Sequence, residues 1–175
     1  MAKTILLLRH AKSAWSDPRL EDHERPLSRR GEQAAKAMAA HIARREPRPD
    51  LILCSTAMRT RQTLAPLVKL LDAPAPPIAL EKALYLASED VLLAHLRSVA
   101  DEVATVLLIG HNDGIWHFAE GLAGNGPAGP LAALREKYPT GALATLRPPD
   151  GPWRNMAWGS AELMAFVRPR DLAAA

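Results

Sequence analysis

Residues suited to phosphate chemistry follow the first apolar segment of the chain. Residues 5–8 are strand-like, and Arg9, His10, Lys12 and Ser13 come directly behind them. Guanidinium groups bind phosphoryl oxygens through paired hydrogen bonds, and a neutral imidazole is a nucleophile. Open α/β sheets bind their ligands at the carboxyl ends of strands. We therefore expect His10 to be a nucleophile or a ligand-binding residue rather than a surface group.

Two further apolar segments end in residues of the same kind. Residues 51–53 precede Ser55, which could cap a helix whose first turns carry Arg59. Residues 106–109 precede His111, and the glycines on either side of this histidine would let the backbone approach a ligand. We expect Arg59 and His111 to converge with the arginine and histidine that follow the first strand.

The order of the segments predicts the scaffold that positions these groups. Strand-like runs alternate with helical patterns, which indicates a single α/β domain spanning residues 1–175. We expect three α/β/α layers around a mostly parallel sheet. Helices are predicted at residues 28–45, with Ser28 as the cap, and at residues 57–71, 88–99 and 115–122.

The carboxyl-terminal part of the chain has a different pattern. Glycine and proline are frequent in residues 124–130, which predicts a loop before a short helix at residues 131–137. Residues 141–146 and 153–158 lie on either side of a turn at residues 148–151. This arrangement predicts a hairpin-like addition at the sheet edge.

Composition narrows the class of protein. Hydrophobic residues make up 48% of the 175, which is sufficient for a core without disulfides, and the single cysteine, Cys54, excludes an internal disulfide. The net charge is +3, but basic and acidic residues are interleaved and aromatics make up only 5%, which argues against nucleic-acid binding. The amino terminus is typical of neither a signal peptide nor a membrane span, so we expect a cytoplasmic protein with no membrane partner. The oligomeric state stays open.

The motifs resemble those of the histidine phosphatase superfamily, the phosphoglycerate-mutase-like group. Arg9-His10 matches its Arg-His-Gly motif, residues 55–63 look like its Ser-x-x-x-Arg-x-x-x-Thr segment, and Gly110-His111 looks like its second-histidine motif. The short chain and the Arg-Pro-Leu-Ser-x-x-Gly segment at residues 25–31 are similar to SixA-type phosphohistidine phosphatases. The resemblance covers nearly the whole chain.

The resemblance implies a cofactor-independent phosphatase. Neutral His10 would attack phosphorus and form a phosphohistidine that water later hydrolyses. Arg9 and Arg59 would bind the phosphoryl oxygens, and His111 would donate a hydrogen bond to them. These side chains would supply the positive charge that magnesium supplies in kinases, so no metal is expected.

The chain departs from the family pattern at two positions. Ala11 replaces the motif glycine, and Ser16 stands where many mutase-type relatives have a phosphate-binding asparagine. Lys12, Ser13 or Ser16 could supply the missing donor. The departures keep open an impaired module that binds phosphate or a phosphoprotein without turnover.

The proton donor for the leaving group decides the substrate class. Glu81, Asp113 and Asp17 are the candidates, and the chain could also lack a donor. Without one, the leaving group must be good by itself, which favours phosphohistidine or aryl phosphates over alkyl esters. We expect a phosphohistidine protein as substrate, with a small phosphomonoester as the alternative.

Overall fold

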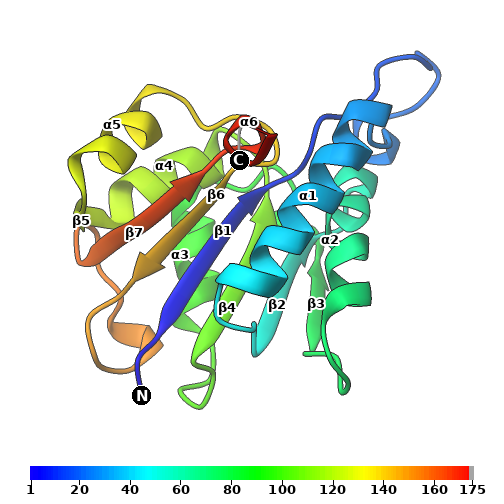
Figure 1. Ribbon diagram of the computed structural model, residues 1–175. Helices are drawn as coiled ribbons and strands as arrows, with labels where there is room; N and C mark the ends of the chain where they lie inside the picture. Colours follow the sequence, from blue (N-terminus) through cyan, green and yellow to red (C-terminus); the bar gives the residue numbers. More distant parts are fainter. Residues whose placement is uncertain (174–175) are drawn as a thin grey trace.

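The computed structural model describes residues 1–173 and confirms the α/β fold, with one mixed sheet of seven strands between two layers of helices (Figure 1). The strand order is β3-β2-β4-β1-β6-β7-β5. Only β6 runs against its neighbours, so the sheet is mostly parallel. The strands are β1 (Thr4–Arg9), β2 (Leu51–Ser55), β3 (Ile78–Glu81), β4 (Thr105–Gly110), β5 (Ala123–Asn125), β6 (Leu143–Arg147) and β7 (Ala161–Val167).

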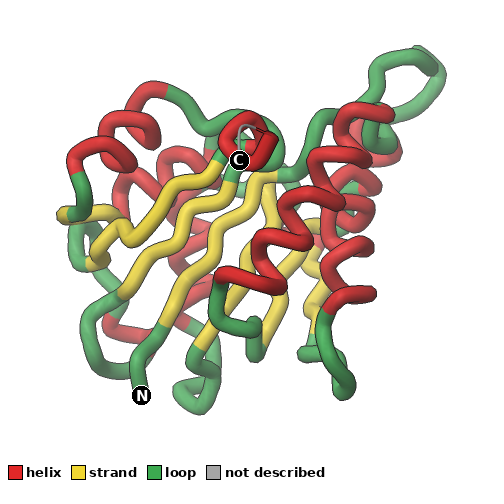
Figure 2. Tube along the Cα trace, in the orientation of Figure 1, coloured by secondary structure: helices red, strands yellow, loops and turns green. Residues whose placement is uncertain are grey.

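Helices cover both faces of the sheet (Figure 2). The four helices predicted within residues 28–122 are confirmed to within two residues at each end, with Ser28 and Ser88 as the N-caps of the first and third. The first, second and sixth helices pack on one face, and the third, fourth and fifth pack on the other. The helices are α1 (Arg29–Arg45), α2 (Met58–Leu70), α3 (Glu89–Arg97), α4 (Gly114–Leu122), α5 (Ala128–Glu136) and α6 (Pro169–Ala173). None of the helices within residues 1–173 has the length and apolar character needed to span a membrane.

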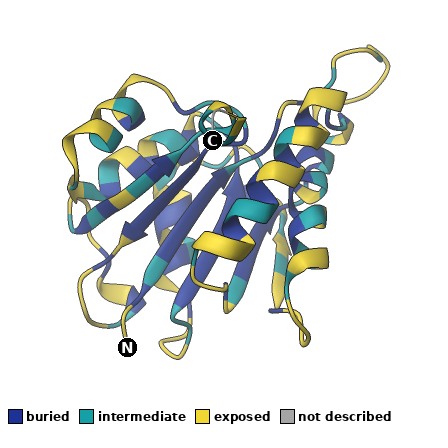
Figure 3. Cartoon of the chain, viewed as in Figure 1, coloured by how far each residue is buried: buried dark blue, intermediate teal, exposed yellow. Residues whose placement is uncertain are grey.

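The central strands β1 and β4 are buried on both faces, as the dark sheet in Figure 3 shows. Their sequences are therefore continuously apolar rather than alternating. They pair in parallel from Thr4 with Thr105 to Arg9 with Gly110. The chain leaves β1 toward α1 on one face and leaves β4 toward α4 on the other. Such a divergence of neighbouring connections opens a crevice at the carboxyl ends of the strands.

The structure corrects the prediction for the carboxyl-terminal part. The second strand of the edge addition is β7, not residues 153–158, because Trp153 lies in a 3₁₀ helix, η3 (Trp153–Asn155), and is buried in the core. The predicted loop at 124–130 contains the end of β5 and the start of α5, so that helix begins three residues earlier than predicted. The strand β3 was not predicted, since its residues are partly exposed at the sheet edge.

Gly31 sets the position of the loop that follows β1. A Cβ atom at residue 31 would lie 1.9 Å from the carbonyl oxygen of Lys12, which also accepts a 2.9 Å hydrogen bond from the Ser28 backbone. We predict that Gly31→Ala lowers the free energy of unfolding by about 1–3 kcal/mol in urea denaturation, because the loop must move to relieve the overlap. The control is Gly129→Ala in α5, where an added Cβ atom would meet no neighbouring atom within 4 Å. Equal stabilities of the two variants would contradict the prediction.

Candidate active site

His10 is held as a neutral base at the end of β1. Its Nδ1 atom lies 2.7 Å from the carbonyl oxygen of Ala11. A carbonyl oxygen only accepts hydrogen bonds, so Nδ1 carries the proton and Nε2 keeps its lone pair. Burial lowers the pKa of His10 to about 3, with the positive charges of Arg9 and Arg59 acting in the same direction. His10 is thus a neutral imidazole with a free nucleophilic nitrogen at physiological pH.

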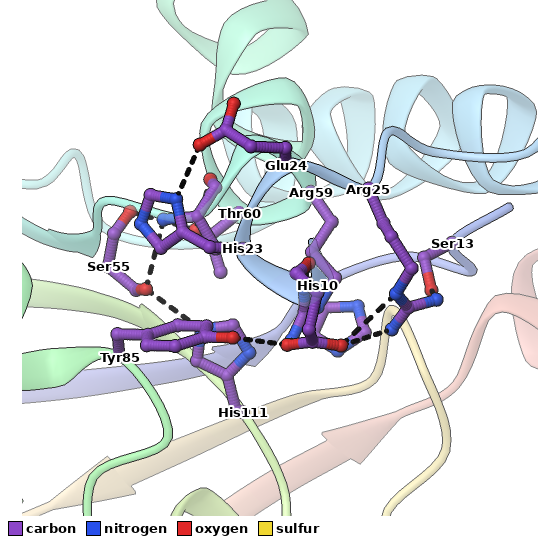
Figure 4. A network of polar contacts seen from close by, with 12 residues as sticks. His10, Ser13, His23, Glu24, Arg25, Ser55, Arg59, Thr60, Tyr85 and His111 are labelled. Carbon is purple, nitrogen blue, oxygen red and sulfur yellow. Dashed lines mark hydrogen bonds and ion pairs between the residues drawn. The ribbon is translucent and has the colours of Figure 1, made fainter. Parts of the chain in front are cut away.

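The guanidinium of Arg59, in the first turn of α2, is buried near Arg25 and Tyr85 (Figure 4), and Asp22 anchors it. Arg59 Nη1 donates to the Asp22 carbonyl oxygen at 2.8 Å, and Nη2 donates to the carboxylate at 3.0 Å. Arg25 Nη2 donates to the same carboxylate at 2.9 Å, and the Tyr85 hydroxyl donates to it as well. One carboxylate therefore fixes two guanidinium groups.

Asp22 stays ionised in this position. Burial would raise the pKa of Asp22, but the hydrogen bonds from Tyr85, Arg59 and Arg25 outweigh burial and hold this pKa well below its usual range. Asp22 lies in a 3₁₀ helix, η1 (Asp22–Glu24), at the end of the loop that projects beyond α1 in Figure 1. The ionised Asp22 carboxylate therefore orients the two arginines but has no proton to donate.

His111 follows β4, and its ring centroid lies 5.3 Å from that of His10. Its Nε2 lies 2.8 Å from the Ser55 hydroxyl, whereas its Nδ1 is buried without a partner among the described residues. Burial, and after it the nearness of His10, lowers the pKa of His111 to about 3. When the Ser55 hydroxyl donates to Nε2, the proton of the neutral ring lies on Nδ1, which then has an unused donor.

A threonine joins the two halves of the site. Thr63 Oγ1 accepts a 2.9 Å hydrogen bond from the backbone N–H of Ala11 and donates at 2.7 Å to the carbonyl oxygen of Arg59. The loop after β1 is thereby tied to the first turn of α2. The four-residue spacing from Arg59 to Thr63 places both on one side of α2, so this bridge depends on helical geometry.

These groups surround a cavity of about 340 Å³ at the carboxyl ends of the parallel strands. Four cationic side chains line it, and no acidic side chain of residues 1–173 does. A cavity with this lining is suited to binding an oxyanion. The lining residues are Arg9, His10, Lys12, Ser13, Trp15, Arg25, Arg59, Leu86, His111, Asn112 and Thr140.

The cavity contains six of the residues selected from the sequence. These are Arg9, His10, Lys12, Ser13, Arg59 and His111. Arg9 Nη1 donates to the Tyr138 carbonyl oxygen at 2.9 Å, which holds the guanidinium at the end of its strand. The convergence expected from three strand ends is therefore present in the fold.

Two other selected residues lie outside the cavity lining. Ser16 is exposed in the loop after β1. Glu81 ends β3, where it pairs in register with Ser55, and its side chain is not among those that line the cavity. Of the other acid candidates, Asp113 is exposed with its charge near Arg9, and Asp17 pairs with Arg19 at 3.1 Å in an exposed loop.

Sequence reasoning missed several residues of the site. Asp22 and Tyr85 had no motif to mark them, and Arg25 was noted only as part of a segment pattern. The predicted cap role of Ser55 is wrong, because the N-cap of α2 is Ala57 and the Ser55 hydroxyl contacts His111. The signal that could have found Asp22 is its place three residues before Arg25, since a carboxylate and a guanidinium at that spacing pair within one turn.

Comparisons with known proteins identify similar chains. Residues 5–84 match the family model of the histidine phosphatase superfamily (branch 1). An uncharacterized protein of Mycobacterium tuberculosis (strain H37Rv) is 38% identical over 165 residues, covering 93% of this chain and 100% of that protein.

Two solved structures resemble this one over nearly their whole length. The SixA protein of Nakamurella multipartitia, assigned as a phosphohistidine phosphatase, has a TM-score of 0.83 at 30% identity, with 97% of each chain covered. The SixA protein of Agrobacterium tumefaciens, with the same assignment, has a TM-score of 0.80 at 32% identity, covering 97% of this chain and 99% of that one.

The neutral state of His10 predicts how stability depends on pH. An unfolded histidine takes up a proton near its usual pKa of 6.5, whereas folded His10 does so only near 3. The stabilisation is complete above about pH 6.5 and is lost as the pH falls toward 3. Between pH 6.5 and 4.5 we expect the free energy of unfolding of the wild type to fall by about 1–3 kcal/mol more than that of His10→Gln. Parallel pH profiles in urea denaturation would show that folded His10 titrates like a free imidazole.

Proposed function

We propose that this chain, which belongs to the histidine phosphatase superfamily and is of the SixA type, hydrolyses protein phosphohistidine through a phosphohistidine intermediate on His10. The observation that carries the proposal is the 2.7 Å hydrogen bond from Nδ1 of His10 to the Ala11 carbonyl oxygen. This bond leaves Nε2 as the reactive nitrogen beside a set of guanidinium groups.

In the first step, Nε2 of His10 attacks phosphorus. The bond from phosphorus to the leaving group breaks, and its electron pair departs with that group; a phosphohistidine that carries a proton on its other ring nitrogen leaves as neutral imidazole. Arg9 and Arg59 stabilise the negative charge on the phosphoryl oxygens. His111 donates a hydrogen bond from Nδ1 to one of these oxygens. Arg25 joins this set because it lines the same cavity and shares the Asp22 carboxylate with Arg59.

In the second step, water attacks the phosphorus of phosphorylated His10. The bond from phosphorus to Nε2 breaks, its electron pair returns to the imidazole, and the proton of the water passes to the phosphate product or to solvent. Neutral His10 is regenerated, and inorganic phosphate leaves. The arginines supply the positive charge of the transition state, so the proposed steps involve no cofactor.

The acid-base character of the cavity favours phosphohistidine over alkyl phosphates. The cavity is lined by no acidic side chain of residues 1–173, and Asp22 is held as an anion. An imidazole leaving group has a conjugate acid of pKa ~6.5, whereas an alkoxide is far more basic and depends on a proton donor. The assignment of two similar SixA proteins as phosphohistidine phosphatases supports the same substrate class.

A comparison of three substrates tests the proposal. Phosphate release is measured on a phosphohistidine protein, an aryl phosphate and an alkyl phosphate, with the wild type, His10→Ala and the control His117→Ala, whose residue is exposed on α4. We expect turnover of the phosphohistidine protein and the aryl phosphate, no detectable turnover of the alkyl phosphate, and loss of all turnover in His10→Ala alone.

Two other results would each identify a different function. Efficient hydrolysis of the alkyl phosphate would identify a phosphomonoesterase with a proton donor such as Asp113 or Glu81. Vanadate or phosphate binding without His10-dependent turnover of any substrate would identify a binding module. Either result would overturn the proposed substrate class.

Arg59 can be tested against a neighbour on the same helix. We predict that Arg59→Ala lowers kcat/KM about 100- to 1,000-fold and weakens vanadate binding, because a transition-state donor is lost. Arg61→Ala is the matched control, since Arg61 is exposed and its guanidinium donates a hydrogen bond to the Met58 sulfur at 3.9 Å. Steady-state kinetics and vanadate inhibition measure both. Unchanged vanadate affinity in Arg59→Ala would remove this arginine from phosphoryl binding.

A further inference from the structure

A second cavity, of about 300 Å³, adjoins the catalytic cavity, and we propose that it binds acidic side chains of the phosphoprotein substrate next to its phosphohistidine. We call it the basic groove. Lys12 and Thr140 line both cavities, so the two lie side by side. The inference rests on the proposed function and adds to it the feature by which a protein substrate is selected. The groove is lined by Lys12, Arg30, Ala34, Ala133, Glu136, Lys137, Pro139, Thr140, Arg168, Pro169 and Arg170.

The basic groove concentrates positive charge. Five of its lining residues are lysine or arginine, and only Glu136 is acidic. Arg168 is held by Asp171, through hydrogen bonds of 2.9 Å from both Nε and Nη2. When Glu136 and Asp171 are subtracted from the five basic residues, three positive charges remain. This excess equals the net charge of the whole chain. The remaining residues of the sequence therefore sum to no net charge.

Most of these charges lack a partner in the part of the chain that the structure describes. Among residues 1–173, no ion pair or side-chain hydrogen bond is formed by the charged groups of Lys12, Arg30, Lys137 and Arg170, and all four residues are exposed. Like charges gathered around one hollow repel one another, and an anion bound between them would relieve the repulsion. The groove thus favours a ligand with carboxylate or phosphate groups.

The fold brings these residues together from distant parts of the sequence. Lys12 follows β1, Arg30 lies in the first turn of α1, Lys137 follows α5, and Arg168 and Arg170 flank the start of α6. Figure 1 shows the end of α5 and the start of α6 at the same edge of the sheet as the carboxyl end of β1. The groove lies beside the reacting atoms because that edge also carries His10.

The groove is fixed relative to the nucleophile. Lys12 is two residues from His10, and its carbonyl oxygen accepts hydrogen bonds from both the backbone N–H and the hydroxyl of Ser28, at 2.9 and 3.2 Å. Gly31 packs against the same carbonyl. A group that binds in the groove therefore has a defined position relative to a phosphoryl group on His10.

A protein segment fits the site better than a second phosphate of a small molecule. The mouth of the catalytic cavity carries two exposed apolar side chains, Trp15 at 76% and Leu86 at 55% exposure. A protein surface around a phosphohistidine would cover these side chains and extend its acidic residues into the groove. A small bisphosphate would occupy the groove and leave both side chains in water.

The test reverses the charge of two groove residues that do not line the catalytic cavity. The groove variant is Lys137→Glu/Arg170→Glu, and the control is Arg44→Glu/Arg45→Glu at the far end of α1, with the same change in net charge. The ligands are a phosphohistidine protein with acidic residues flanking its histidine, the same protein with these residues neutralised, and a small bisphosphate. Binding is measured in the His10→Ala background and turnover in the unmodified background, together with turnover of an aryl phosphate.

We expect the groove variant to bind the acidic phosphoprotein about 10-fold more weakly and to raise its KM by a similar factor. Aryl phosphate turnover stays unchanged, and so does binding of the neutralised protein, which does not use the groove. Raising the salt concentration weakens binding of the acidic protein to the wild type more steeply than to the groove variant. The control variant behaves like the wild type.

Three results would overturn the proposal. These are equal binding by the groove and control variants, an equal loss of affinity for the neutralised protein, and a loss confined to a small bisphosphate. The last would identify a second phosphate as the occupant. Because binding is measured in the His10→Ala background, the outcome does not depend on hydrolysis, and failure of the proposed function would appear separately in the turnover assay.

Discussion

The site depends on keeping a buried imidazole neutral beside several guanidinium groups. Burial keeps it neutral, aided by the positive charges of Arg9, Arg59 and Arg25, and two interactions fix the geometry of the site. The carbonyl oxygen of Ala11 holds the proton of His10 on Nδ1, and the carboxylate of Asp22 anchors Arg59 and Arg25 in fixed positions. A cationic surrounding disfavours the imidazolium form, and the same cations attract the phosphoryl group. Nucleophile and oxyanion site thus support each other.

The scaffold explains why these groups meet. Neighbouring strands β1 and β4 connect to helices on opposite faces of the sheet, so a crevice opens where both strands end. Each strand is buried along its length and ends in polar residues, which places His10 and His111 at the floor of that crevice. The remaining donors come from α2 and from the loop between β1 and α1. Most of the chain serves as a rigid frame for a few side chains.

Much of this arrangement could be predicted from the sequence. The apolar runs that end in Arg9-His10 and Gly110-His111 are local signals, and so is the Ser28 cap of α1. Asp22 and Tyr85 could not be found in this way, because their roles depend on contacts between segments far apart in the chain. The edge strand β3 lacks an alternation of apolar and polar residues. Neither the strand nor the position of Glu81 at its end could therefore be predicted. Local patterns reveal buried strands and helix caps, whereas partners across loops appear only in the folded chain.

The most direct test of the central claim is to identify the phosphorylated residue during turnover. The enzyme is mixed with a phosphohistidine protein or an aryl phosphate, quenched within the first turnover under conditions that preserve phosphohistidine, and mapped by peptide mass spectrometry. We expect a phosphoryl group on His10, formed and lost at rates consistent with turnover. A phosphoryl group on another residue, or phosphate release at the wild-type rate by His10→Ala, would contradict it.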